Sequence, residues 1–453
     1  MKIHPLRLLP VTLACFSFLA SQPAAAQPVD DTQAKQAIIF GRHAVRTPVL
    51  PNSLLNAFSA QPYPVFPGVP TGPPPTGLAV ITPNGAANET ILGSYFHLWL
   101  KQEGLLTGND SADANFVYFR ANDTPLITDT AQAFWTGMLP TAGPPNVNVV
   151  SPGSDPLFDP VGAGVALLDY PMAVAAVNGR LGSNPQALAT AYAPELALTR
   201  SVLLGYPVNE TPAPLPPANV TDVTNFTANP ITATAGSASV PVNLGGLEQV
   251  TSAIDPFVME YTDGLPMAEV GWGQLTSGSI SQIFRLYDLL LNLEYRTSYL
   301  AQVQSSNVAS HIVRSLVQTA TGNATPGALA SATTKVIVLI ASNTNISGLA
   351  GLLHLDWLVP SYQPDVSALS GVLMFELRQS QSTGEYIVRT SYVSQTMDQL
   401  RNQTPLTLDA PPASAPVFIP GCSVYNATFD CPLGKFVRVT GGLIDPHSAD
   451  LVN

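Results

Sequence analysis

The chain has 453 residues, of which only 11% are charged, and its formal net charge is -12. An acidic chain with so few cations has no general electrostatic attraction for nucleic acid or for an anionic membrane, so neither is expected as a partner. An anionic small molecule would need a local basic pocket. The length suggests two or three domains, or one domain with a large insertion, and leaves the oligomeric state open.

The N-terminus has the pattern of a secretory signal peptide. Lys2 and Arg7 precede an apolar stretch at 8–20, and Ala24-Ala25-Ala26 supplies an A-x-A cleavage site. The stretch is too short to span a bilayer. Cys15 lies in a poor lipobox, so a soluble periplasmic or secreted protein is expected once residues 1–26 are removed.

The first elements frame a short polar motif. An apolar run at 37–40 predicts a buried strand, and GRHAVRTP at 41–48 follows it as a loop that ends at a proline. Residues 61–76 are too rich in proline for a helix or a central strand. Helical spacing begins at Glu89, a second strand is predicted at 115–120, and a second helix begins near Thr128.

The middle of the chain gives a weaker pattern. Residues 154–282 show little regular spacing, and a part rich in Pro, Thr, Ala and Asn at 207–245 predicts an irregular segment. A long helical pattern then runs from 281 towards 319.

The last part contains the clearest strand, KVIVLI at 335–340. It is followed by the turn ASNTN at 341–345 and an apolar helix at 346–358, and residues 371–377 and 386–393 predict a strand hairpin. Strands that alternate with helices indicate an α/β fold with a mostly parallel sheet. In such sheets ligands bind beyond the carboxyl ends of the strands, where GRHAVRTP and ASNTN are both expected.

Arg42, His43 and Arg46 indicate an anion site that contains a nucleophile. The planar guanidinium group matches phosphate with paired hydrogen bonds and stays charged at acidic pH. The alternative is a surface loop with solvated arginines and a histidine that serves only packing. The sequence favours the first interpretation through a wider resemblance.

The chain resembles the histidine acid phosphatase family, in its branch of bacterial periplasmic acid phosphatases and phytases. GRHAVRTP resembles the family's RHGxRxP, RANDTPLITDTAQAF resembles RANxxQRTxxTAQAF, and ASNTNISGLAGLLHLDW resembles HDTNxxxLxxLLxLDW. YRTSYLAQVQSSNVASHIV resembles the family's long helix, and the terminal FIPGC and CPL segments continue the series. The resemblance implies an α/β domain at 27–153 and 283–453, a mostly α-helical insertion at 154–282, and an active site between them.

The family's chemistry assigns a role to each matching residue. His43 would attack phosphorus and form a phosphohistidine that water then hydrolyses, while Arg42 and Arg46 would bind the phosphoryl oxygens. No cofactor or metal is implied. The expected ligand is a small phosphate ester, or another small ligand in the same pocket.

Three functional positions depart from the family pattern. Ser342 and Asn343 stand in place of the HD pair, and Leu126 stands in place of the arginine of QRT. The missing aspartate is the family's proton donor to the leaving group, and the other two residues contact phosphate. Asn343 can donate a hydrogen bond but cannot transfer a proton. Ala44 also replaces the glycine of RHG.

Two function hypotheses follow from these losses. A positioned general acid contributes about 10²–10⁴ in rate, so a phosphomonoesterase with this site should be slow and should favour acidic leaving groups. The alternative is a non-catalytic or differently catalytic descendant that binds an anionic or weakly charged ligand. Asp123 could replace the lost acid, although an ordinary turn residue is the simpler interpretation. His354 and Asp356 lie too far along the following helix.

The cysteines that remain after signal removal are Cys422 and Cys431. An even number in an exported chain predicts a disulfide between them. Two free thiols are the alternative, and a zinc site has no neighbouring ligands to complete it.

Overall fold

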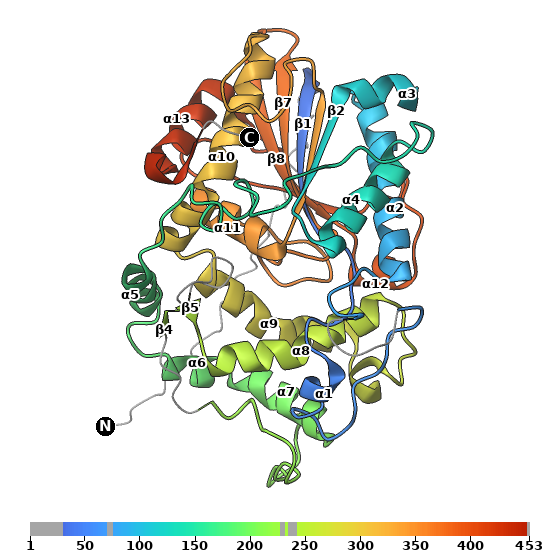
Figure 1. The fold of residues 1–453 in the computed structure, drawn as a ribbon, viewed down its shortest axis with the longest axis vertical. Coiled ribbons are helices and arrows are strands. Elements are labelled where there is room, and N and C mark those ends of the chain that lie inside the picture. Colours follow the sequence, from blue (N-terminus) through green and yellow to red (C-terminus); the bar gives the residue numbers. More distant parts are fainter. Residues whose placement is uncertain (1–29, 70–75, 227–231, 234–241, 451–453) are drawn as a thin grey trace, which may run out of the picture. The chain divides into compact units, whose positions relative to one another are not determined.

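The computed structural model describes residues 30–69, 76–226, 232–233 and 242–450, shown as the coloured ribbon in Figure 1. The predicted signal peptide lies outside the described residues. Residues 32–453 form one compact unit.

A mixed eight-stranded sheet forms the centre of this unit, with strand order β10-β8-β7-β1-β6-β2-β3 and with β9 paired to β8. Its strands are β1 (Thr32–Arg42), β2 (Val117–Ala121), β3 (Asn148–Val149), β6 (Val336–Ala341), β7 (Val372–Ser380), β8 (Tyr386–Ser394), β9 (Ala413–Pro416) and β10 (Cys431–Pro432).

The part of the sheet that carries the site is parallel. Strand β6 pairs in parallel with β1 on one side and with β2 on the other, and β3 extends this series beside β2. Strands β7 and β8 form the predicted antiparallel hairpin, and β7 pairs with β1. The predicted α/β fold class is confirmed.

Helices cover both faces of the sheet (Figure 1). Alternate residues of β1 explain this, because Ala37 and Ile39 belong to the core under one group of helices while Ile38 and Phe40 belong to the core under the other. The first group comprises α2 (Pro83–Gln102) and α4 (Pro125–Met138). The second comprises α10 (Ser298–Thr321), α11 (Asn343–Leu353) and α13 (Leu433–Leu443).

A second set of helices has an apolar core of its own. The core draws on α5 (Tyr170–Arg180), α7 (Ala193–Leu204), α8 (Gly246–Thr262) and α9 (Ser277–Glu294). The expected insertion at 154–282 covers most of these helices, but residue 282 lies inside α9. The boundaries of the three-part division therefore remain a prediction.

Shorter elements connect these parts. They are α1 (Asn52–Leu55), α3 (Asp110–Asp113), η1 (Ala114–Phe116), α6 (Gln186–Ala191), β4 (Thr232–Ala233), β5 (Val242–Asn243), η2 (Val270–Gly273), α12 (Met397–Arg401) and η3 (Pro446–Ser448). Strands β4 and β5 pair with each other within the segment predicted to be irregular, 207–245.

The long helical pattern at 281–319 corresponds to two helices, α9 and α10, rather than one. Thr297 separates them, because its backbone is extended and its hydroxyl donates a hydrogen bond to the Leu293 carbonyl at 2.6 Å. A threonine side chain can in this way replace a helical backbone partner and end a helix. The apolar spacing continues across the break, so the pattern did not reveal it.

The predicted disulfide is present. It joins Cys422 and Cys431, whose Cα atoms lie 5.3 Å apart, and both residues are buried in the core beside α13. The bond closes the loop that precedes α13. Closing such a loop contributes on the order of 2–4 kcal/mol to stability.

Glu89 gives the fold a specific pH dependence. It is buried in α2, its Oε2 atom has no hydrogen-bond partner among the described residues, and burial raises its pKa to about 8. The folded state therefore favours the protonated acid. This stabilisation is complete below the ordinary glutamate pKa of 4.5 and is lost as the pH rises to about 8, at roughly 1.4 kcal/mol per pH unit.

We expect Glu89→Gln to flatten this part of the stability profile. The neutral amide replaces the protonated carboxyl, so the free energy of unfolding should change less between pH 5 and 8, to be measured by urea unfolding. The exposed Glu385→Gln is the matched control and should keep the wild-type profile. An unchanged slope in Glu89→Gln would show that Glu89 is not the group responsible.

Candidate active site

The site lies at the carboxyl ends of β1 and β6. Arg42, the last residue of β1, is paired in register with Ala341, the last residue of β6. The His43 amide then donates a hydrogen bond to the Ala341 carbonyl at 3.0 Å. Because the two strands are parallel, the loops that follow them leave the sheet at the same edge. The motifs GRHAVRTP and ASNTN are thereby brought together.

His43 is buried, and its two ring nitrogens differ. Nδ1 lies 2.9 Å from the Ala44 carbonyl oxygen. A carbonyl only accepts, so Nδ1 carries the proton and Nε2 keeps its lone pair. Burial lowers the pKa of His43 well below its usual value, and the charges of Arg42 and Arg46 lower it further. The ring is therefore neutral with a lone pair on Nε2, which is the state that a nucleophilic histidine requires.

Arg42 is buried beside this histidine with an incomplete set of partners. Its Nη1 atom donates to the Ser367 carbonyl at 2.5 Å, whereas Nε has no partner among the described residues. Burial lowers the pKa of Arg42, but a guanidinium stays charged throughout the physiological range. No carboxylate among the described residues forms a hydrogen bond with Arg42, so its positive charge is not offset by a direct ion pair.

Arg46 is held in a buried ion pair. Its Nη1 and Nη2 atoms donate to the two carboxylate oxygens of Asp255 in α8, both at 2.9 Å. Burial alone would lower the pKa of Arg46, but the Asp255 carboxylate raises it above its usual value. This pairing fixes the guanidinium and offsets its charge. Together, Arg42, Arg46 and Asp255 leave the site with one net positive charge.

Asp255 was not singled out in the sequence, because it lies in the weakly patterned segment 154–282. Tyr287 of α9 was not singled out either. Its hydroxyl accepts a hydrogen bond from Asn343 Nδ2 at 3.3 Å. Asn343 is the first residue of α11, directly after β6. Tyr287 therefore contacts Asn343, the residue expected at the family's proton-donor position.

Ser342 is engaged with the start of its own helix. Its hydroxyl donates to Asn345 Oδ1 at 2.7 Å and lies 2.5 Å from the Thr344 hydroxyl. The Ser342 amide also donates to Asn345 Oδ1. These hydrogen bonds cap the N-terminus of α11, and they already engage the Ser342 hydroxyl.

Leu126 is buried in the first turn of α4, which is tied to the nucleophile loop. The Ala44 amide donates to the Thr130 hydroxyl at 3.2 Å, and that hydroxyl donates to the Leu126 carbonyl at 2.7 Å. This turn of α4 therefore reaches the loop that carries His43. The apolar side chain of Leu126 brings no positive charge to this loop, unlike the arginine that the family pattern has at this position.

The other candidate acids lie elsewhere. Asp123 is exposed and lines a surface pocket with Ser342. His354 is an exposed residue at the C-terminal end of α11, and Asp356 forms an exposed ion pair with Arg296 at 2.7 Å. Asn343 stands at the opposite end of that helix, so neither His354 nor Asp356 belongs to the site.

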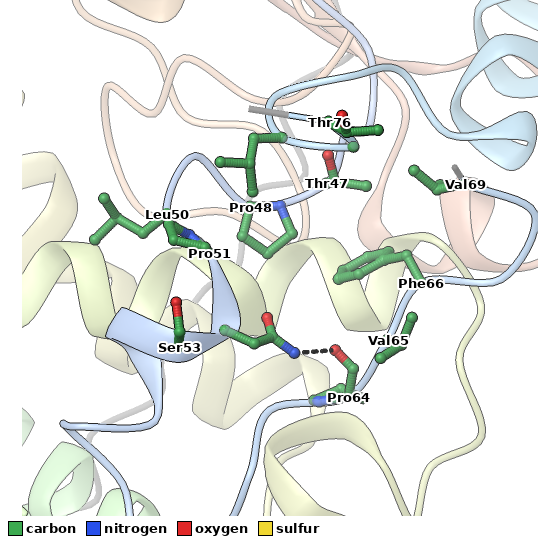
Figure 2. A pocket seen from close by; sticks show the side chains of 13 residues that line it. Thr47, Pro48, Leu50, Pro51, Ser53, Pro64, Val65, Phe66, Val69 and Thr76 are labelled. Atoms are coloured by element: carbon green, nitrogen blue, oxygen red, sulfur yellow. Dashed lines mark hydrogen bonds between the residues drawn. The ribbon is translucent and has the colours of Figure 1, made fainter. Parts of the chain in front are cut away.

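Three pockets adjoin the motifs: a small apolar one is lined by Arg42, and the two larger ones are lined by neither Lys nor Arg. The two larger pockets differ in their walls. The first has a volume of about 300 Å³, is mostly apolar, and begins at Thr47 and Pro48, directly after Arg46. Figure 2 shows Pro48, Phe66 and Val69 among its walls. The second has a volume of about 250 Å³ and includes Ser342 and two carboxylates, Asp123 and Asp159. The surroundings of the site thus favour neutral groups over further anionic groups.

Two further findings concern only the described residues. No group of three or more His, Cys, Asp and Glu side chains there could hold a metal ion. None of the described helices is long and apolar enough to cross a membrane.

An α/β sheet with a histidine between two arginines at the carboxyl ends of its strands is the arrangement expected for the histidine acid phosphatase class. Sequence and structure comparisons agree with this expectation, because the chain is similar along nearly its whole length to bacterial phosphatases and phytases, which is consistent with the histidine acid phosphatase family. No protein-family model matches it.

The particular relatives are bacterial phosphatases that match along nearly their whole length. The chain is 25% identical over 424 residues to phytase AppA of Escherichia coli, covering 93% of this chain and 94% of that protein. It is 25% identical over 434 residues to a glucose-1-phosphatase of Salmonella typhimurium, covering 95% and 98%. A solved structure of Hafnia alvei phytase in complex with tartrate has a TM-score of 0.79 and 26% identity, covering 93% and 99%.

Proposed function

We propose that the protein is an exported phosphomonoesterase that acts through a phosphohistidine at His43. The observation that carries this proposal is the neutral His43 ring, whose Nδ1 proton is held by the Ala44 carbonyl and whose Nε2 lone pair is free. Arg42 and Arg46 would bind the phosphoryl oxygens, and Asn343 stands where the family has its proton donor. The N-terminal pattern at residues 1–26 supports export to the periplasm or the medium.

The preferred substrate should carry one phosphate on an otherwise uncharged alcohol. The site has one net positive charge, and the two larger neighbouring pockets contribute no further cation. Leu126 and Ser342 supply no charged contact in place of the family's clamps. A polyanion such as phytate would find no cation for its remaining phosphates in either larger pocket, and Asp123 and Asp159 would repel those that enter the second.

One observation favours the alternative of a protein that binds a weakly charged ligand without turnover. Asp255 already satisfies Arg46 with two hydrogen bonds, so a phosphate would gain less from this arginine than from a free one. Such a descendant would bind its ligand in the same pocket without forming phosphohistidine.

The proposed function is tested with purified mature protein and a panel of substrates. We expect hydrolysis of aryl phosphates, with slower hydrolysis of glucose-1-phosphate and little of phytate, because the two larger pockets lack cations. Loss of the aryl phosphatase activity in His43→Ala would assign it to this site. If neither phosphate release nor His43 dependence is found in the folded protein, the binding alternative is favoured.

A further inference from the structure

Tyr287 of α9 lies beside Asn343 at the candidate active site. Its hydroxyl oxygen lies 3.3 Å from Asn343 Nδ2. Asn343 lies two residues after Ala341, whose carbonyl accepts a hydrogen bond from the His43 amide. The charges of Arg42 and Arg46 both act on the pKa of Tyr287. The phenol therefore stands among the phosphate-binding groups, beside the position of the lost acid.

The hydroxyl proton of Tyr287 is available for donation. The amide nitrogen of Asn343 can only donate, so in this hydrogen bond the tyrosine oxygen accepts and its own proton points elsewhere. Among the described residues the Tyr287 hydroxyl donates no hydrogen bond, although the Asp255 carboxylate acts on its pKa from nearby. A phosphate ester bound between Arg42 and Arg46 would supply an acceptor.

We propose that Tyr287 is the proton donor to the leaving-group oxygen, in place of the acid lost at position 343. Asn343 acts through Tyr287, as a positioning residue that holds the phenol by its oxygen. This assignment rests on the proposed phosphomonoesterase function. Under this assignment Asn343 does not act as an acid itself, but positions Tyr287, which does.

Hydrolysis with Tyr287 as proton donor has two steps. In the first, Nε2 of His43 attacks phosphorus, the bond from phosphorus to the ester oxygen breaks, and the departing oxygen takes the proton of the Tyr287 hydroxyl. The tyrosinate that forms is stabilised by Arg42, Arg46 and the Asn343 amide. In the second, water attacks the phosphohistidine, its proton passes to Tyr287, and the electrons of the nitrogen–phosphorus bond return to Nε2.

A phenol suits this role when the leaving group is an aliphatic alcohol. Burial raises the pKa of Tyr287 above its usual value and the Asp255 carboxylate raises it further, whereas Arg42, Arg46 and Asn343 lower it. Tyr287 therefore keeps its proton at neutral and acidic pH. An alkoxide is a stronger base than a phenolate and takes this proton readily, whereas an acidic phenol leaves without protonation.

Asp288 is the rival proton donor. It follows Tyr287 on α9, burial raises its pKa well above the usual value, and its Oδ2 has no partner among the described residues. It lines a small apolar cavity with Arg42, Phe284 and Leu369. Consecutive residues of a helix point about 100° apart, so Asp288 cannot share the contact of Tyr287 with Asn343.

The test compares alkyl and aryl phosphates across a series of leaving-group acidities. We expect Tyr287→Phe to lower kcat/KM for alkyl phosphates by about 10²-fold or more, because a general acid is lost. For the most acidic aryl phosphates the change should stay within roughly threefold, since they need no acid. Tyr63→Phe is the matched control, because this buried hydroxyl donates only to the Ala253 carbonyl.

Two further variants test the roles of acid and support. Asn343→Asp in the Tyr287→Phe background should restore alkyl phosphate hydrolysis, because the introduced carboxyl can supply the proton. Asn343→Ala should move the basic limb of the alkyl phosphate pH profile upwards, because the hydrogen bond from Asn343 lowers the pKa of Tyr287. A purely structural role of Asn343 would not move this limb.

The outcomes distinguish the role of Tyr287 from the phosphomonoesterase function itself. Equal losses on alkyl and aryl phosphates in Tyr287→Phe, or a leaving-group effect in Asp288→Asn instead, would overturn the assignment while leaving His43-dependent hydrolysis intact. Faster turnover in Tyr287→Phe would also overturn it, since the phenol would then obstruct the phosphate site. A folded wild type without His43-dependent hydrolysis of any aryl phosphate would overturn the proposed function itself.

Discussion

Replacing His43 by alanine is expected to lower the rate of aryl phosphate hydrolysis by at least about 10⁴-fold, because the variant loses its nucleophile. Nε2 of His43 is the ring nitrogen that keeps its lone pair, and the charges of Arg42 and Arg46 act on this ring. Water cannot take its place easily, since the two-step route exists only if phosphorus is first transferred to nitrogen. Initial rates with an aryl phosphate at saturating concentration measure the effect.

His97→Ala is the control for this change. His97 lies on α2, where its Nδ1 atom contacts the Met138 carbonyl at 2.9 Å, remote from the nucleophile loop in the chain. We expect this variant to hydrolyse aryl phosphates at the wild-type rate. Residual activity in His43→Ala above about 1% of wild type would be too large for loss of the nucleophile by the same reasoning, and would mean that another group attacks phosphorus.

Replacing Asp255 by asparagine is expected to have the second largest effect, on stability and on anion affinity together. Removing one partner of a buried ion pair leaves the other charge uncompensated, at a cost of roughly 3–5 kcal/mol. The same change adds one net positive charge to the site, so inorganic phosphate should inhibit more strongly. Urea unfolding and the inhibition constant of phosphate measure the two effects.

Asp155→Asn is the matched control for Asp255→Asn. Asp155 forms an equally buried pair with Arg120, with hydrogen bonds of 2.8 and 2.7 Å. We expect a similar loss of stability from this variant without stronger inhibition by phosphate, because Arg120 is paired away from His43. If both variants change phosphate inhibition alike, Asp255 has no special electrostatic role at the site.

The sheet was largely predictable because its central strands are continuous apolar runs. KVIVLI at 335–340 is buried on both faces, and the structure shifts this strand by only one residue, to Val336–Ala341. Strands β3, β9 and β10 were missed because two to four residues are too few for a periodic pattern. Helix α8 was missed within the weak segment, where Pro256 inside the helix signals a break that does not occur.

The site was predictable only where it is contiguous in the sequence. Arg42, His43 and Arg46 fall within five residues, and their types alone suggest an anion and a nucleophile. Asp255 and Tyr287 reach the site from helices far along the chain, and no local pattern marks them. A tyrosine on an amphipathic helix reads as a core residue until the fold places its hydroxyl beside Asn343.

The central claim is that phosphorus passes through His43, and trapping the intermediate tests it most directly. The wild-type protein is mixed with an aryl phosphate, quenched within milliseconds in alkali, which preserves phosphohistidine, and digested for mass spectrometry. We predict a phosphate on the peptide that contains His43, absent from His43→Ala and lost when the substrate is exhausted. Steady hydrolysis of the ester with no phosphate ever detected on His43, under conditions that preserve a phosphohistidine standard, would contradict the account.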